Sequence, residues 1–229
     1  MGSNMYSWNN IDELFKKLHN NNCKYIILRN YEEITEDNFY MVGHADIDFL
    51  VDNSRKFAKI INAVPRFNED DKIHYLIDIL GHEVVIDVRQ IGDGYYDTNW
   101  ERTMIKDRFM FNNRFYINNT INYYYSLVYH AFLQKETISD DYLERLDAMA
   151  ANLNIPAKGV NQHLEHLENY MRLNNYWYTL PYDIWVPLKK EYINPKYIKK
   201  YFKVFFRDCK YNLMSMLSRI KNLFIKKRG

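Results

Sequence analysis

The pattern of hydrophobic and polar positions changes near residue 118 of this 229-residue chain. Before that point, short apolar runs bounded by polar and turn residues predict β-strands. These runs are Lys24–Leu28, Ala45–Val51, Ile73–Leu80, Glu83–Gln90 and a short strand within Arg108–Ile117. Apolar residues at helical spacing predict helices over 9–21 and 55–64, the second ended by Pro65. A tight turn at Gly81-His82 is expected to join two of the strands.

After residue 118 the apolar periodicity becomes helical. Helices are predicted over 121–134, 140–153 and 158–174, and the aromatic, proline-punctuated stretch Tyr176–Pro187 is expected to be irregular. A last helix is predicted over 195–226. We therefore expect an α+β protein with an α/β domain over 1–118, a helical domain over 119–188 and a helical tail over 189–229.

Charge is distributed unevenly along the chain, although its net value is only +2. Residues 189–229 hold 13 Lys and Arg against two acids, a net +11, whereas residues 1–188 hold 18 bases and 27 acids, a net −9. A basic amphipathic tail is typical of peripheral contact with an anionic membrane, but a helix packed on the domain with a solvated basic face fits equally well. The acidic body argues against a long nucleic-acid partner.

Compartment signals point to a cytoplasmic protein. The first residues are polar with no apolar segment behind them, and no run of about 18 apolar residues occurs anywhere. The two cysteines, Cys23 and Cys209, are too few for a disulfide framework, which favours a reducing compartment.

Two carboxylates stand out in the segment Gly43-His44-Ala45-Asp46-Ile47-Asp48-Phe49-Leu50-Val51. Side chains at i and i+2 of a strand share a face, so Asp46 and Asp48 are expected side by side. Adjacent carboxylates repel each other, and a divalent cation removes that penalty. Oxygen ligands of this kind suit Mg²⁺, with Mn²⁺ as an alternative. The competing interpretation is an exposed strand with two solvent-facing acids.

A third carboxylate, Asp87, interrupts the apolar run Val84–Val88. That run is expected to lie beside the strand of Asp46 and Asp48, and an acid inside a buried strand needs a partner. A shared metal would supply one, and three carboxylates around metal are the usual arrangement for displacement at phosphorus. An ion pair with Arg89 or Arg29 is the simpler alternative.

The order Gly-x-x-Asp-Ile-Asp on a strand, then a helix, then an isolated Asp in a later strand resembles the nucleotidyltransferase superfamily of the polymerase-β type. The resemblance implies a mixed sheet with flanking helices, and it implies that Asp46, Asp48 and Asp87 are the catalytic, metal-binding residues. The segment Ile27–Glu32, together with Tyr129-His130-Ala131-Phe132 and Ser139–Tyr142, resembles a branch associated with bacterial surface-polysaccharide loci. This resemblance covers roughly residues 24–145.

The chain departs from the superfamily where a Gly-Ser doublet usually grips the nucleotide phosphates. Arg29-Asn30 stands there instead, and Arg29 suits either a bidentate phosphate contact or a structural salt bridge. Gly43, His44 and His130 complete the predicted substrate-binding set. A buried, hydrogen-bonded histidine on an apolar helix face is the alternative for His130.

These observations predict a Mg²⁺-dependent transferase that moves a nucleoside monophosphate from an NTP to a small hydroxyl or phosphate acceptor destined for a surface polymer. The helical domain would cover the substrate, and residues 195–229 would place the enzyme at the inner face of the membrane. Two other hypotheses stay open: a phosphotransferase of the phosphocholine-transferase type with a CDP-linked donor, and a catalytically silent docking protein. An antitoxin-type or RNA-modifying nucleotidyltransferase fits the acidic body poorly.

Overall fold

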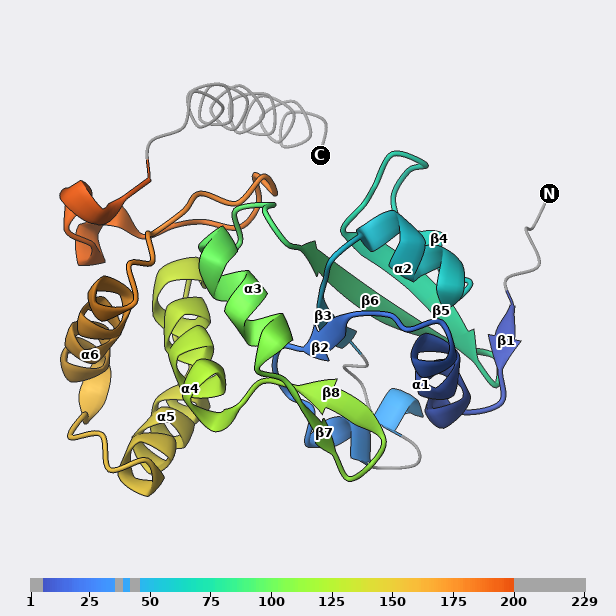
Figure 1. Cartoon of the computed structure of the whole chain (residues 1–229), viewed down its shortest axis with the longest axis horizontal. Coiled ribbons are helices and arrows are strands. Elements are labelled where there is room, and N and C mark those ends of the chain that lie inside the picture. The colour runs from blue at the N-terminus through green and yellow to red at the C-terminus, as the bar shows by residue number, and fades with distance from the viewer. Residues whose placement is uncertain (1–5, 36–38, 42–45, 200–229) are drawn as a thin grey trace, which may run out of the picture.

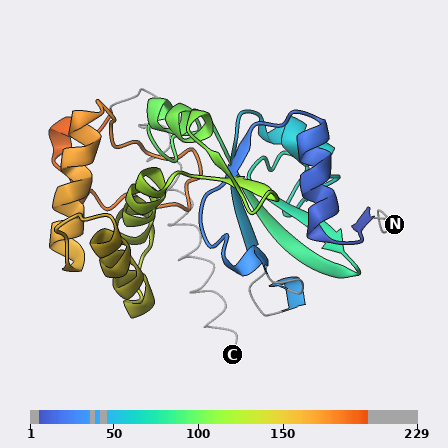
Figure 2. The ribbon, with the colours of Figure 1, turned by 60° about the horizontal axis from the view of Figure 1, so that its bottom comes forward.

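A computed structural model of the chain describes residues 6–35, 39–41 and 46–199. One mixed sheet has helices on both faces and continues into a helical half (Figures 1 and 2). The strands are β1 (Ser7–Trp8), β2 (Tyr25–Ile27), β3 (Asp46–Val51), β4 (Val64–Pro65), β5 (His74–Ile79), β6 (His82–Gln90), β7 (Phe109–Phe111) and β8 (Phe115–Ile117). Their order is β1-β5-β6-β3-β2-β8-β7, and β4 pairs with β5.

The helices fall where the apolar periodicity predicts them, with one addition. They are α1 (Ile11–Asn20), α2 (Ser54–Ile60), α3 (Thr98–Lys106), α4 (Thr120–Tyr129), α5 (Asp140–Asn152) and α6 (Gly159–Leu173). A π-helical turn, η3 (His130–Gln134), extends α4, and 3₁₀ turns occupy η1 (Glu33–Thr35), η2 (Phe39–Met41), η4 (Lys190–Tyr192) and η5 (Pro195–Tyr197). The α+β class with a helical C-terminal half is thus confirmed.

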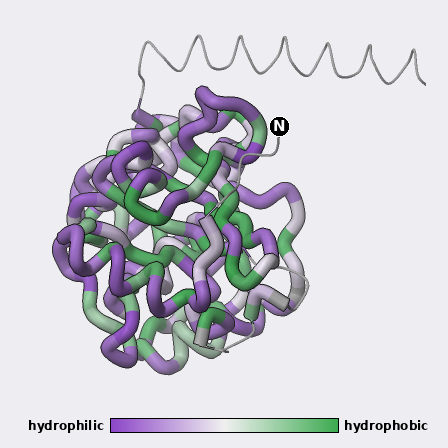
Figure 3. Tube along the Cα trace, turned by 90° about the vertical axis from the view of Figure 1, so that its right-hand side faces the viewer, coloured by the Kyte–Doolittle hydropathy of each residue, from purple (hydrophilic) through white to green (hydrophobic). Residues whose placement is uncertain are grey.

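Two hydrophobic cores lie on opposite faces of the sheet. On one face, α1 and α2 pack on Ile27, Phe49 and Ile86, which alternate with residues of the other face. On the other face, Leu28 and Leu50 contact the cluster formed by α3 to α6. Hydrophobic and hydrophilic stretches alternate along the trace, and the outer turns are mainly hydrophilic (Figure 3).

Local signals explain why α1 forms where it does. The side chain of Asn10 caps it by accepting from the backbone N–H of Glu13, and acids occupy its first turn. Its apolar stripe, which includes Leu14, Phe15 and Leu18, is buried against the sheet. Most of a short helix's stability comes from such a packed face, so the sheet stabilises this helix.

Helix α3 was not predicted from the sequence. Its buried residues Trp100, Met104 and Ile105 are accompanied by Glu101, an acid with no exposed surface that breaks the apolar stripe. Glu101 accepts hydrogen bonds from the backbone N–H groups of Gly92 and Tyr96. A buried acid satisfied by the backbone of the preceding loop therefore hid the amphipathic pattern.

Three boundaries differ from the prediction. Helix α2 ends at Ile60, because Asn62 adopts a left-handed conformation and Pro65 lies in the short strand β4. The expected strand over 108–117 is a hairpin of two strands that turns at Asn112 and Asn113, both with positive φ. The turn between β5 and β6 is centred on Leu80 and Gly81, one residue earlier than expected.

The predicted tail helix does not begin at Pro195. Residues 195–197 form a 3₁₀ turn, and Ile198 then makes a parallel bridge with Tyr178. The remainder of the predicted helix, 200–226, lies outside the described residues. Within the described part of the chain, no helix is long and apolar enough to cross a bilayer.

Candidate active site

Parallel pairing of β3 with β6 brings the predicted carboxylates together. Asp48 lies directly opposite Asp87 in the register, and Asp46 lies opposite Val85. Side chains in register on neighbouring strands share a face, so Asp46, Asp48 and Asp87 all point to the face that also carries Leu50. The prediction that the run around Asp87 lies beside the first aspartate strand is confirmed.

These carboxylates line a cleft between the sheet and the helical half, with a volume of about 950 Å³. The helical cover packs on Leu50, whereas Asp46 and Asp48, nearer the start of the same strand, stay at the open end. Arg29 and Asn30 line the cleft from the segment after β2, and His130 and Lys135 line it from the helical side. The fold thus gathers Arg29, Asn30, Asp46, Asp48, Asp87 and His130 of the predicted set into one cavity.

Asp48 is held by a buried ion pair. Its Oδ1 lies 2.5 Å from Nη2 of Arg29, and the side chains are only 7% and 9% exposed. Burial alone would lower the pKa of Arg29, but Asp48 and the surrounding tyrosines outweigh it and raise that pKa well above its ordinary value. The guanidinium therefore stays charged, and the salt bridge that the sequence left open for Arg29 is present.

The same guanidinium begins a hydrogen-bond chain into the helical half. Nη1 of Arg29 donates to the hydroxyl of Tyr95 over 3.1 Å, and that hydroxyl lies 3.0 Å from Nδ1 of His130. Burial, followed by the positive charges of Arg29 and Lys135, holds the pKa of His130 well below its ordinary value, so the imidazole is neutral. The buried, hydrogen-bonded histidine expected as the alternative for His130 is thus present, and it also faces the cleft.

Asp87 lacks the partners that the sequence suggested for it. Arg29 pairs with Asp48, and Nη1 of Arg89 pairs with Oδ2 of Asp183 at 3.0 Å. Oδ1 of Asp87 is buried and has no hydrogen-bond partner among the described residues. Burial and the charge of Asp48 raise the pKa of the Asp87 carboxyl.

The donor chemistry of this corner fits a divalent cation, because a buried, unpartnered carboxylate oxygen lies beside a second carboxylate. However, no group of three or more His, Cys, Asp and Glu side chains within residues 6–35, 39–41 and 46–199 is gathered closely enough to hold a metal ion. In addition, the ion pair with Arg29 occupies one oxygen of Asp48. A cation bound here would therefore compete with Arg29 for Asp48.

Asn30 connects the cleft to the helical half. It adopts a left-handed conformation with φ 54°, and its Oδ1 accepts from Nη1 of Arg145 on α5 over 3.0 Å. The other terminal nitrogen of Arg145 lies 2.9 Å from Glu32. These contacts fix the segment after β2, which presents Arg29 to Asp48. Two further predicted residues, Gly43 and His44, lie outside the described residues.

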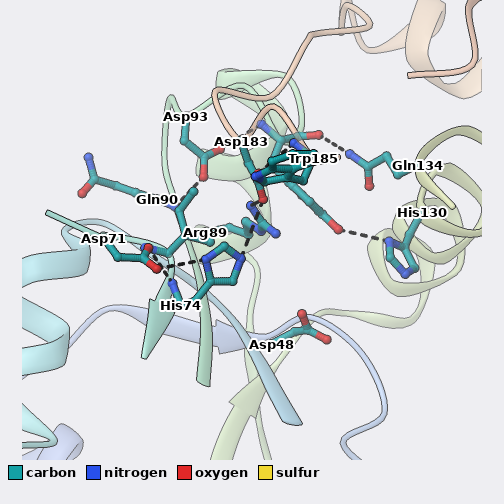
Figure 4. Close-up of polar contacts among 12 residues, drawn as sticks. Asp48, Asp71, His74, Arg89, Gln90, Asp93, His130, Gln134, Asp183 and Trp185 are labelled. Carbon is teal, nitrogen blue, oxygen red and sulfur yellow. Dashed lines mark hydrogen bonds and ion pairs between the residues drawn. The ribbon is translucent and has the colours of Figure 1, made fainter. Parts of the chain in front are cut away.

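Beside the carboxylates, the segment 176–187 is anchored over the end of β6 (Figure 4). Asp183 accepts from Arg89, and Nε2 of His74 lies 3.9 Å from the same oxygen. His74 also lies 3.2 Å from Asp71, through Nδ1. The guanidinium of Arg89 lies 4.4 Å from the centre of the Tyr95 ring, which ties this network to the hydroxyl that joins Arg29 to His130.

Sequence reasoning missed Tyr95, Lys135 and Arg66, which belong to the site or its support. Tyr95 follows the Gly92-Asp93-Gly94 break, where a loop tyrosine in a chain with 21 tyrosines carries no signal. Lys135 lies one residue beyond the predicted helix over 121–134, so the sequence could have placed it at the end of a helix that lines the cleft. Arg66 offered no such cue.

Comparisons with known proteins add little to this geometry. No family model matches the chain, and no curated protein is significantly similar to it. A crystal structure of an antigenic nucleotidyltransferase-like protein from Paracoccidioides brasiliensis aligns with a TM-score of 0.43 and 13% identity, covering 72% of this chain and 87% of that one. A likeness of this degree assigns neither fold nor function to the chain.

Proposed function

We propose that the chain is a metal-dependent transferase of phosphorus-containing groups, and specifically a nucleotidyltransferase that uses an NTP. The observation that carries this proposal is Asp48 directly opposite Asp87, with Asp46 in the same cleft of about 950 Å³. Cavities of this size hold nucleotide-sized ligands. The strand pairing is the one expected from the apolar run around Asp87, and the order of the three aspartates along the chain is the one that resembles nucleotidyltransferases.

Asp46, Asp48 and Asp87 are the residues that would hold Mg²⁺ or Mn²⁺. When bound, such an ion neutralises charge on the transferring phosphoryl group and orients it. Asp87 has a further role: it lines the cleft beside Asp48, which places its carboxylate to accept the proton of an acceptor hydroxyl. Arg29 holds Asp48 in place by charge and by hydrogen bonding.

The test is titration of the protein with ATP, CTP, GTP and UTP, with and without Mg²⁺, for wild type and the Asp46→Asn/Asp48→Asn variant. Metal-dependent binding of one nucleotide that the variant loses supports the proposal. Asp70→Asn is the matched control, because Asp70 is exposed and lies outside the cleft lining. Equal binding by wild type and the carboxylate variant would refute the assignment of these residues.

Product analysis separates the two enzymatic hypotheses. Nucleotidyl transfer from an NTP releases pyrophosphate, whereas a phosphotransferase with a CDP-linked donor releases CMP. If neither product appears with any donor while the fold is intact, the catalytically silent docking protein becomes the better hypothesis.

An acceptor destined for a surface polymer and a peripheral contact with the membrane extend the same proposal. They are supported by the net charge of +11 over residues 189–229 and by the resemblance to polysaccharide-locus nucleotidyltransferases. Sedimentation with vesicles of phosphatidylglycerol, for the full chain and for a variant with the lysines at 226 and 227 replaced by glutamine, tests the membrane contact. Binding that does not change between the two variants would count against it.

A further inference from the structure

The two walls of the cleft differ in the polar groups that they present, and the helical wall holds one carboxylate, Asp141, beside its donors. The sheet wall carries the carboxylates Asp46, Asp48 and Asp87, whereas the helical wall carries His130 and Lys135 around the end of η3. A phosphate bound between them would meet a cation held by carboxylates on one side and hydrogen-bond donors on the other. This division resembles the way phosphate sites generally balance charge.

Arg29, the cation first expected to grip phosphate, is engaged elsewhere. Both terminal nitrogens of Arg29 are used, one by Asp48 and one by the Tyr95 hydroxyl. The side-chain oxygen of Asn30 accepts from Arg145. That contact leaves the amide N–H groups of Asn30 as donors, but with Arg29 engaged and no Gly-Ser doublet at this point, a bound phosphate needs a further cation in the cleft.

The hydrogen-bond chain determines which nitrogen of His130 carries the proton. The Tyr95 oxygen accepts from Arg29, and a buried hydroxyl proton needs an acceptor of its own, which Nδ1 of His130 provides over 3.0 Å. Nδ1 is then the unprotonated nitrogen of a neutral imidazole, so Nε2 carries the hydrogen. His130 is 9% exposed, and that small surface lies in the cleft.

Lys135 supplies the charge. Its ammonium lies 4.3 Å from the centre of the Tyr142 ring, and it makes no ion pair within the described part of the chain. It directly follows η3, whose π-helical hydrogen bonds span five residues and so bring the positions of His130 and Lys135 to one side. Gln134 donates to the backbone carbonyl of Tyr95 over 2.8 Å and holds this turn on the same tyrosine.

We propose that His130 and Lys135 form a phosphate subsite on the helical wall, with Tyr95 as the positioning residue that directs the Nε2–H of His130 into the cleft. The role of this subsite in a transfer reaction rests on the proposed function, whereas the binding of phosphate there does not. The ligand is a phosphate group, which either the donor's polyphosphate or a phosphorylated acceptor would supply.

Calorimetric titration with two probes tests the subsite and separates these sources. Inorganic pyrophosphate represents the donor and glycerol 3-phosphate the acceptor, each with and without excess Mg²⁺. Lys135→Gln is expected to weaken at least one probe about tenfold, the usual effect of removing a charged hydrogen-bond donor. Lys59→Gln, which removes an equal charge from an exposed position on α2, should stay within about twofold of wild type. Equal binding by Lys135→Gln and wild type, or no wild-type binding of either probe at about 1 mM, overturns the proposal.

The positioning role has its own readout. In protein labelled with ¹⁵N-histidine, the signal that disappears in His130→Phe belongs to His130 and should report a neutral ring protonated at Nε2. Tyr95→Phe should shift that signal toward a mixture of tautomers and weaken the same probe as Lys135→Gln, with the fold intact by circular dichroism. A wild-type ring protonated at Nδ1, or a tautomer unchanged in Tyr95→Phe, overturns the role of Tyr95.

Failure of the subsite and failure of the proposed function give different results. Probe binding that depends on Lys135, without transfer from any NTP or CDP-linked donor, leaves the subsite standing and removes the transferase. Transfer that depends on Asp46 and Asp48 but is equal in Lys135→Gln and Lys59→Gln leaves the transferase standing and removes the subsite.

Discussion

Replacing Asp87 by asparagine should make the protein more stable. The carboxyl oxygen that is buried without a partner, and the charge of Asp48 beside it, make the ionised form of Asp87 unfavourable in the folded state. Leaving a buried polar group unsatisfied costs about 1–3 kcal/mol, and an amide of the same shape removes the charge and offers a donor to Asp48. We expect a gain of about 1–2 kcal/mol at pH 7.5, or roughly 2–4 °C in Tm per kcal/mol for a chain of this size.

The pH dependence gives the sign of the effect. An acid whose folded-state pKa is raised costs nothing below its unfolded pKa of about 3.9, where both states are protonated. The cost grows as pH rises from there toward the folded pKa, and it is complete above it. The advantage of Asp87→Asn should therefore be larger at pH 7.5 than at about pH 4.5.

Urea unfolding at the two pH values, with Asp70→Asn as the exposed control, measures this difference. Loss of stability in Asp87→Asn at pH 7.5, or a gain that is the same at both pH values, would refute the electrostatic reasoning. Excess Mg²⁺ should then stabilise wild type, by about 2.7 kcal/mol at 100 times its Kd, and stabilise Asp87→Asn much less. Equal stabilisation of both proteins would place the cation away from Asp87.

Three further substitutions test the packing around the site. Arg29→Met should lower the free energy of unfolding by about 3–5 kcal/mol in urea, because it leaves Asp48 buried and unpaired, and the double variant with Asp48→Leu should recover most of the loss. Additive effects of the two changes would contradict this. Gly94→Ala should cost more than Gly81→Ala by thermal unfolding: both have φ near 80°, but a Cβ on Gly94 would lie 2.6 Å from a backbone carbonyl oxygen, whereas one on Gly81 would meet nothing. Equal losses of stability in the two variants would show that the backbone around Gly94 shifts to make room for the Cβ. Burial, and then the charge of a nearby aspartate, raises the pKa of Cys23 to about 11. In a variant with the other cysteine replaced by serine, the reaction of Cys23 with Ellman's reagent at pH 8 should therefore be slow until the protein unfolds. Rapid reaction of the folded protein would be the contrary result.

Much of the catalytic face follows from local rules that act over a few residues. The alternation of side chains along a strand places Asp46 and Asp48 together, and the apolar run around Asp87 marks a buried strand. Their predicted adjacency is confirmed by the pairing of β3 with β6. Because these patterns need no knowledge of distant partners, the fold class and the carboxylate cluster could be predicted.

The environment of those carboxylates depends on contacts between distant parts of the chain. Arg29 and Asp48 are 19 residues apart, Arg29 and Tyr95 are 66 apart, and Tyr95 and His130 are 35 apart. No periodicity connects such positions, so the choice between a salt bridge and a phosphate contact for Arg29 could not be made from the residue alone. The protonation state of His130 likewise depends on what surrounds it.

Helix α3 shows the same limit within the fold itself. Its stripe is broken by Glu101, whose burial is tolerated only because backbone N–H groups of the preceding turn satisfy it. The periodicity of apolar residues along the chain indicates which side chains are buried away from water, whereas the hydrogen-bond partners of a buried polar side chain depend on three-dimensional packing. The elements and the candidate ligands could therefore be predicted from the chain, but the charge and orientation of each group in the cleft required the tertiary structure.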